Sequence, residues 1–376
     1  MPVSERLQAL FAANLKRIIA YYETGPVVWA VGVSGGADSL ALVYLLKKWS
    51  DEFNVRVVAL TVNHQLRPEA GAEAEYVALL MKKIGVEHHI LYWEGQKPEK
   101  GIEEAAREAR YGLLRKWCLE NDVPVLLVAH NQRDQAETFL MRLQRGSGVD
   151  GLAAMQERTE RNGIELWRPL LNVLPEDLRA YLREQGVQWV EDPSNRDDDY
   201  LRVRIRKLLP VLEESVGITV ERLAATTGRM ARVRDYLETE TEKFIKSDVV
   251  FWEKCGCAFS PAGWQKLHQE LRLRVLAFLL KKIGENVYPP RLEESERLEA
   301  ALLSEDFKNR TLGGCEIIKF GRRIWIVREM RCRGVLRRKE WDDYVMAHSA
   351  LKSQKLPYKL RLAFCRKEKE CIGTKE

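Results

Sequence analysis

The sequence predicts an α/β protein with a doubly wound parallel sheet, followed by a helical domain and a small basic C-terminal region. Two observations predict the sheet. Short Val-rich runs alternate with helix-length segments between residues 27 and 145, and a turn rich in Gly and Ser follows the first run. Strands that alternate with helices in this way form parallel sheets with right-handed crossovers. The third observation is that this alternation stops near residue 210, where the chain becomes basic and helical.

The expected elements follow one another along the first half of the chain. Residues 7–22 have the apolar spacing of an amphipathic leading helix. Residues 27–33 are short, apolar and rich in valine, which predicts a buried strand. The alternation continues with helix 38–49, strand 55–62, helix 71–84, strand 88–92, helix 102–120, strand 124–129 and helix 134–145, and residues 164–168 and 187–191 are candidates for further short strands.

Three domains are expected, with boundaries near residues 210 and 335. Residues 1–210 would form the catalytic sheet domain, which ends after a polar loop at 192–199. Residues 211–335 would form a mostly helical domain that ends in a β-hairpin over 312–327, where glycines flank two apolar runs. Residues 336–376, which are basic and lack clear periodicity, would form a C-terminal tail or the remnant of a C-terminal domain.

Composition indicates a soluble globular protein of a reducing compartment. Hydrophobic residues make up 45% and charged residues 31% of the 376 residues. No apolar run approaches the ~20 residues of a membrane span, and the N-terminus lacks a signal-peptide core, so we expect a cytoplasmic protein without membrane contact. The seven cysteines lack the spacing of a disulfide framework. Cys255 and Cys257 form the one close pair, and a lone Cys-x-Cys more often holds ordinary thiols than a metal.

The net charge of +6 is unevenly distributed. Eight Lys or Arg residues stand against one acid between Lys319 and Arg338, and seven stand against one acid between Lys352 and Lys369. Such asymmetry suits a polyanion such as RNA, although a solvated basic face has the same composition. Arg331 and Arg333 are the candidate phosphate contacts in the first of these stretches.

The turn after the first strand has the features of a phosphate-binding loop. It consists of Ser34, Gly35, Gly36, Ala37, Asp38 and Ser39. Glycines let the backbone approach a ligand, serine hydroxyls donate to oxyanions, and the N-terminus of the following helix favours negative charge. A carboxylate would repel phosphates unless a divalent cation bridged them, which makes Asp38 a candidate Mg²⁺ ligand. An ordinary turn with a Ser or Asp N-cap is the simpler alternative.

A second group of candidate residues follows strand 124–129. His130 stands at the end of this strand and therefore at the same edge of the sheet as the loop. Asp134 and Glu137 follow at helical spacing, which places both carboxylates on one face near a helix N-terminus. Acids at that position are also ordinary helix caps. Arg107 and Arg110 lie three residues apart on the preceding helix, where surface ion pairs are the common role.

The order of residues in the loop narrows the choice of protein families. It lacks the lysine of a Gly-x-x-x-x-Gly-Lys-Ser/Thr loop and is not Gly-x-Gly-x-x-Gly. It resembles the pyrophosphate loop of the N-type ATP pyrophosphatases, which cleave ATP between the α and β phosphates. Further motifs resemble, in order, those of the tRNA(Ile)-lysidine synthetases: residues 107–111, 130–148, 167–171 and 191–195, and then Arg202, Arg204 and Arg206. The resemblance is close over residues 27–210 and looser over 215–330.

This resemblance implies an enzyme that converts the wobble cytidine in the CAU anticodon of tRNA(Ile) into lysidine with ATP, Mg²⁺ and free L-lysine. It implies that residues 34–39 bind ATP, that Asp38 holds Mg²⁺, and that Arg110 and His130 act at the α-phosphate. It also implies that Asp134 and Glu137 bind lysine. The arginines implied to contact tRNA are Arg202, Arg204, Arg206, Arg331 and Arg333. The oligomeric state stays open, with a homodimer among the alternatives.

The chain departs from the family pattern at a few positions. Asn131 stands where a second histidine is usual, Arg133 replaces an acid, and Gln65 replaces a glycine. Other readings are a tRNA thiolase or amide ligase with the same loop, or a non-catalytic RNA-binding relative. Cys118 is the only cysteine in the first 250 residues and lies within a predicted helix, which argues against a thiolase.

Overall fold

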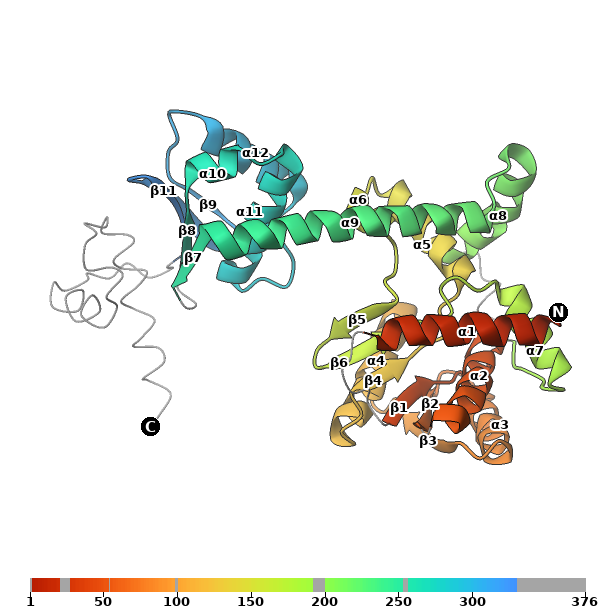
Figure 1. Ribbon diagram of the computed structural model, residues 1–376. Coiled ribbons are helices and arrows are strands. Elements are labelled where there is room, and N and C mark those ends of the chain that lie inside the picture. The colour runs from red at the N-terminus through yellow and green to blue at the C-terminus, as the bar shows by residue number, and fades with distance from the viewer. Residues whose placement is uncertain are drawn as a thin grey trace, which may run out of the picture. The chain divides into compact units, whose positions relative to one another are not determined.

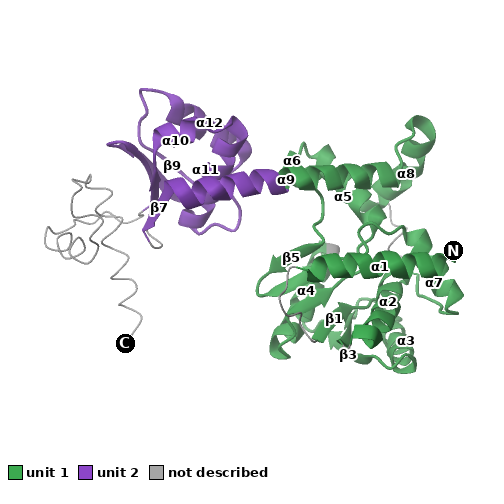
Figure 2. Cartoon of the chain, in the orientation of Figure 1, with its two compact units in different colours: residues 1–234 green, residues 235–376 purple. Residues whose placement is uncertain are grey.

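The structure is a computed structural model that describes residues 2–20, 28–53, 55–98, 101–191, 200–252 and 256–329 (Figure 1). The chain divides into two compact units, residues 1–234 and 235–376 (Figure 2). The long helix α9 (Val220–Asp248) contributes residues to both. The division into three domains at residues 210 and 335 stays a prediction, and the predicted tail lies outside the described residues.

Unit 1 contains a six-stranded sheet in the order β3-β2-β1-β4-β6-β5. All neighbouring strands are parallel except the antiparallel pair β5 and β6, so the predicted doubly wound sheet is confirmed. The strands are β1 (Val28–Gly32), β2 (Arg56–Asn63), β3 (Glu87–Tyr92), β4 (Val125–Leu127), β5 (Arg158–Arg161) and β6 (Ile164–Trp167). Because β1 pairs with β2 on one side and β4 on the other, the loops after β1 and β4 flank the point where open α/β sheets bind ligands.

Helices cover both faces of this sheet. They are needed there because successive side chains of the strands point to opposite faces, and the strands are apolar on both. Trp29 and Val31 of β1 lie in one core with α1 (Val3–Ile19), α2 (Ala37–Phe53), α3 (Ala70–Lys83) and α7 (Pro175–Glu184). Ala30 points to the opposite core, which is formed with α4 (Ile102–Glu120). The indole of Trp29 stacks on that of Trp49, with ring centroids 5.1 Å apart. These cores fix the end of β1 and the start of α2, and hence the loop between them.

The sequence located most elements of this unit within a few residues. The helix predicted at 102–120 has those bounds in α4, and the candidate strand at 164–168 is confirmed as β6. The strand expected at 187–191 is wrong, because these residues form no strand and the Val190 N–H instead donates to the Gly35 carbonyl at 3.0 Å. Strand β5 and helix α7 were not predicted.

Three further helices lie in the site region of unit 1. Helix α5 (Gln132–Gln144) follows β4, and α8 (Leu201–Val216) packs beside it; the short α6 (Val149–Leu152) follows α5. Ala136 and Phe139 of α5 form a small core with Leu209 of α8 and Leu223 of α9. This packing brings the arginines of α8 against the carboxylates of α5.

Unit 2 is built on a five-stranded antiparallel sheet in the order β7-β8-β11-β10-β9. Its hairpin of β10 (Cys315–Phe320) and β11 (Arg323–Arg328) confirms the hairpin predicted over 312–327. The strands β7 (Val249–Trp252), β8 (Gly256–Phe259) and β9 (Arg310–Leu312) were not predicted. The helices are α10 (Pro261–Gln265), α11 (Gln269–Gly284) and α12 (Leu292–Leu303). Across both units, none of the described helices combines the length and apolar character needed to cross a bilayer.

Candidate functional site

The loop between β1 and α2 is held in shape by its own polar groups. The Ser34 N–H donates to the Ser39 hydroxyl at 3.1 Å, and that hydroxyl donates to the Gly36 carbonyl at 3.0 Å. The two serine hydroxyl oxygens lie 3.2 Å apart. Ser34 is exposed whereas Ser39 is buried, so Ser34 is the hydroxyl that a ligand reaches first. The loop opens at the N-terminus of the 17-residue helix α2, whose dipole favours a bound anion.

Gly35 adopts a left-handed backbone with φ of +82°, and a Cβ there would lie 3.2 Å from Val77 Cγ2. We expect Gly35→Ala to lower the free energy of unfolding by about 1–2 kcal/mol and to weaken ATP binding. Gly85→Ala is the matched control, because Gly85 has φ of +68° with no atom near the added Cβ. Calorimetric titration with ATP and thermal unfolding of both variants test this. Equal ATP affinity in the two variants would contradict it.

Asp38 lies in the first turn of α2 and reaches toward the loop that follows β4. One carboxylate oxygen, Oδ2, accepts a hydrogen bond from Asn131 Nδ2 at 2.9 Å. The other, Oδ1, is buried without a hydrogen-bond partner among the described residues. Burial, reinforced by the charge of Asp134, raises the pKa of Asp38 from 3.8 to about 6. An unpartnered buried carboxylate oxygen beside a second carboxylate fits a hard divalent cation such as Mg²⁺. No group of three or more His, Cys, Asp or Glu side chains in the described ranges forms a metal cluster, so further ligands would have to come from ATP or water.

Asn131 joins the two groups of residues that the sequence singled out. It is the N-cap of α5, and its Oδ1 accepts from the backbone N–H groups of Arg133 at 2.9 Å and Asp134 at 3.2 Å. Asp134 completes the capping box, because its Oδ2 accepts from the Asn131 N–H at 2.9 Å. Asp134 is therefore both a helix cap and a neighbour of Asp38. The glycine-rich loop and the acidic helix face a common place in the fold.

Glu137 is fully buried and is neutralised by two arginines of α8. Its Oε1 accepts from Arg206 Nε at 2.8 Å, and its Oε2 accepts from Arg202 Nε. Arg202 also donates through Nη2 to Asp134. The carboxylates predicted to bind lysine are thus paired with two arginines predicted to bind tRNA. A substrate ammonium group would have to share Asp134 with Arg202 or displace it.

His130 lies among cations at the end of β4. Burial, and then the charges of Arg168, Arg202, Arg107 and Arg110, hold the pKa of His130 well below 6.5, so its imidazole is neutral at pH 7. Its Nδ1 is buried, and the described part of the chain provides it with no hydrogen-bond partner. A neutral imidazole can donate a hydrogen bond to a ligand without adding charge.

An arginine cluster surrounds Tyr111, next to His130. The guanidinium carbons of Arg107, Arg110 and Arg161 lie 5.3, 5.5 and 5.7 Å from the Tyr111 ring centroid. Burial lowers the pKa of Arg110, and no carboxylate of the described residues forms an ion pair with it. Arg110 thus carries a half-buried charge beside two further guanidinium groups, which makes this cluster suited to phosphate.

The remaining predicted residues lie in different surroundings. Arg204 is exposed, on the opposite side of α8 from Arg202 and Arg206. Arg331 and Arg333 lie outside the described residues. Arg133, which departs from the family pattern, forms an ion pair with Glu176 at the start of α7.

Sequence reasoning named Asn131 only as a departure from the family pattern and Arg168 only as part of the motif 167–171, and it missed the place of both in the site. The signal for Asn131 was available, since it directly precedes a helix with an acid three residues later, the order of a capping box. Arg168 donates through Nη1 to the Gln156 carbonyl at 2.9 Å, while its Nε is buried and unpartnered among described residues. Arg168 directly follows β6 and therefore stands at the same edge of the sheet as His130, which is the signal that could have found it.

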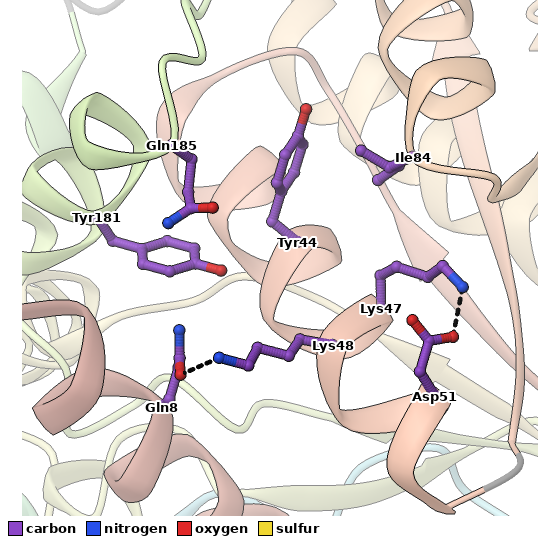
Figure 3. A pocket seen from close by; sticks show the side chains of 8 residues that line it. All are labelled: Gln8, Tyr44, Lys47, Lys48, Asp51, Ile84, Tyr181 and Gln185. Carbon is purple, nitrogen blue, oxygen red and sulfur yellow. Dashed lines mark hydrogen bonds and ion pairs between the residues drawn. The ribbon is translucent and has the colours of Figure 1, made fainter.

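A separate pocket lies beside the second half of α2 (Figure 3). It has a volume of about 320 Å³ and contains none of the predicted site residues. Tyr44, Lys48 and Tyr181 are among the side chains that line it, and Lys48 Nζ donates to Gln8 Oε1 at 2.6 Å. The convergence of the loop, Asp38 and the arginine cluster, rather than this pocket, marks the site.

Comparisons with known proteins agree with this geometry. The PP-loop domain family matches residues 7–212. The tRNA(Ile)-lysidine synthase of Ruegeria pomeroyi is 40% identical over 302 residues, which cover 80% of this chain and 71% of that protein. The tRNA(Ile)-lysidine synthase of Rhodopseudomonas palustris is 36% identical over 344 residues, which cover 88% of this chain and 98% of that protein.

A solved structure supports the fold independently. The U34-tRNA thiolase NcsA from Methanococcus maripaludis superposes with a TM-score of 0.53 over 62% of this chain and 79% of that chain, at 16% sequence identity. This likeness concerns the fold alone. The family itself is shown by the match to the PP-loop domain and by the two synthases, which are 40% and 36% identical: the chain belongs to the tRNA(Ile)-lysidine synthase family of PP-loop, ATP-using enzymes.

Proposed function

We propose that this protein is a ligase that converts the wobble cytidine in the CAU anticodon of tRNA(Ile) into lysidine, using ATP and free L-lysine and releasing AMP and pyrophosphate. The observation that carries the proposal is the hydrogen bond between Asp38 and Asn131. It brings the phosphate loop together with the helix that bears Asp134 and Glu137. Nucleotide and amine sites are thereby adjacent, as a transfer between them requires.

ATP would bind with its β and γ phosphates in the loop of residues 34–39. The N-terminus of α2 and the exposed hydroxyl of Ser34 supply donors there. Asp38 would hold Mg²⁺ through its unpartnered Oδ1, with Asp134 nearby. When bound, the ion neutralises charge on the departing pyrophosphate.

The first chemical step is attack of cytosine O2 on the α-phosphorus, with release of pyrophosphate. Arg110 and the neutral His130 would donate to the α-phosphate oxygens as negative charge develops there. The other arginines around Tyr111, together with Arg168, add positive potential to the same place. The adenylated oxygen then becomes a good leaving group.

The second step is attack of the lysine ε-nitrogen on C2 of the base, with loss of a proton and departure of AMP. Asp134 is the better candidate of the two carboxylates for this amine, because its side chain is 18% exposed whereas that of Glu137 is 0% exposed. An amine with a reference pKa of ~10.4 is protonated at neutral pH, so Asp134 would both hold the ammonium group and receive its proton. Glu137 would instead hold Arg202 in place.

The protein would bind the tRNA mainly through contacts with its phosphates. Arg204 is the strongest of the three α8 candidates because it is exposed to a ligand in solution. The wobble base lies in a single-stranded loop, so taking it out of the stack costs less than flipping a paired base. Arg331 and Arg333 stay predictions from the sequence.

One assay tests the whole proposal. Purified protein is mixed with ATP, Mg²⁺, radiolabelled lysine and unmodified tRNA that carries a CAU anticodon, and each component is then omitted in turn. Label is expected in the RNA only in the complete mixture, and a tRNA with a different wobble base is the matched control. Pyrophosphate release without lysine incorporation would instead favour another adenylating enzyme. Absence of both would favour a non-catalytic RNA-binding relative.

One alternative is disfavoured by the described cysteines. Cys118 is buried in α4, and burial raises the pKa of its thiol to about 12, so it is protonated at neutral pH. The other described cysteines, Cys257 and Cys315, are also buried, and their thiol pKa values are likewise raised by burial. Thiolation needs an available thiolate or a cluster ligand, which none of these three provides.

A further inference from the structure

Asn131 does more in this structure than its place in α5 requires. The residue is only 4% exposed, and both ends of its side-chain amide are used. Oδ1 accepts from two backbone N–H groups in the first turn of α5, while Nδ2 donates to Asp38 Oδ2 at 2.9 Å. The amide has one orientation that satisfies all three contacts, because its oxygen faces donors and its nitrogen faces a carboxylate.

A helix cap needs only the oxygen. Ser, Thr and Asp cap helices about as well as Asn because each offers an acceptor to the first turn. A serine or threonine hydroxyl can also donate, but only from the oxygen that accepts at the cap, so among these four residues asparagine alone carries its donor on a second atom. The donor therefore serves Asp38 rather than α5.

The effect on Asp38 is to distinguish its two oxygens. Oδ2 is tied to α5 through Asn131, whereas Oδ1 is buried and has no hydrogen-bond partner in the described structure. A carboxylate fixed at one oxygen cannot rotate freely about its Cβ–Cγ bond, so the direction of the other oxygen is also fixed. Metal ligands are commonly oriented in this way by a hydrogen bond from a neighbouring side chain.

We propose that Asn131 is a positioning residue that orients Asp38 for a divalent cation. The inference rests on the proposed function, since it assumes that Asp38 is the metal ligand. It assigns Asn131 a role in the site beyond stabilising α5. It also accounts for the contact that joins α2 to α5 across 93 positions of the sequence.

The test separates capping from positioning. Asn131→Ser and Asn131→Thr retain a cap acceptor and lose the amide donor, and Gln132→Ala is the neighbouring control. Mn²⁺ binding is measured by electron paramagnetic resonance in the presence of an ATP analogue with a methylene group between the α and β phosphates. Thermal unfolding of each variant is recorded beside it.

We expect both Asn131 variants to bind Mn²⁺ about tenfold more weakly than the wild type, with unfolding midpoints within a few degrees of it. Gln132→Ala should match the wild type in both measurements. Wild-type Mn²⁺ affinity in the serine and threonine variants would overturn the inference. Asp38→Asn is measured in parallel: if it too keeps wild-type affinity, the metal assignment of the proposed function fails, whereas weakened binding in Asp38→Asn alone rejects only the role of Asn131.

Discussion

Replacing Asp38 with asparagine is expected to abolish pyrophosphate release while making the ligand-free protein more stable at neutral pH. The loss of activity should be at least about 100-fold, because a metal ligand and its charge are removed. The gain in stability follows from the surroundings of the carboxylate. Burial and Asp134 raise the pKa of Asp38 to about 6, which means that the folded protein disfavours the ionised form. The amide of the variant carries no charge and can still accept the hydrogen bond from Asn131.

The pH dependence of this gain has a definite sign. The pKa of Asp38 is higher in the folded chain, about 6, than its ordinary value of 3.8, so the folded state binds the proton more tightly. Ionisation therefore lowers the stability of the wild type progressively between about pH 4 and pH 6, by on the order of 3 kcal/mol. The advantage of Asp38→Asn should be complete above pH 6 and should vanish toward pH 4.

Chemical denaturation of both proteins across this pH range measures the effect. Asp51→Asn is the matched control, because Asp51 lies on the same helix with its side chain 59% exposed and pairs with Lys47 at the surface. That variant should retain wild-type activity and differ little in stability at any pH. If Asp38→Asn were less stable than the wild type at pH 7.5, the carboxylate would be stabilising the fold rather than serving a ligand.

Replacing Glu137 with alanine should cause the largest loss of stability among the site residues. The carboxylate is fully buried and binds Arg202 and Arg206, so its removal takes away the acceptor of the Nε–H group of each arginine. Removing one partner of a buried ion pair costs about 3–5 kcal/mol, and because each arginine here is about one third exposed, we expect about 2–4 kcal/mol. Packing between α5 and α8 should loosen as a result.

A second buried ion pair provides the control for this prediction. In unit 2, Arg272 Nε donates to Glu299 Oε1 at 2.8 Å, and the two side chains are 15% and 4% exposed. Glu299→Ala should destabilise the protein to a similar degree without changing the Michaelis constant for lysine. Glu137→Ala, assayed well below its unfolding temperature, should raise that constant because Arg202 no longer keeps its place beside Asp134. Identical lysine dependence in the two variants would reduce Glu137 to a purely structural role.

Local sequence was sufficient for much of the fold. Strand β1, the loop after it and helix α4 could be located because apolar period, glycine placement and helix length are properties of neighbouring residues. Strands β7, β8 and β9 were missed because each has only three or four residues and shows no readable alternation. The segment 187–191 has the composition of a strand, yet it meets the loop at Gly35 instead of a sheet edge.

The sequence by itself determined which chemistry is available: a glycine-flanked anion loop, an acid that suits Mg²⁺, and paired carboxylates after a second strand. Only the tertiary structure decided which of these groups form hydrogen bonds and ion pairs with other side chains. Helical period places Arg202 and Arg206 on one face of α8, but only the packing of α8 on α5 shows that this face meets Glu137, 65 and 69 residues away. Likewise Asp38 finds its hydrogen bond 93 residues along the chain. The physical reason is that burial and charge pairing depend on contacts between distant segments, which no local pattern encodes.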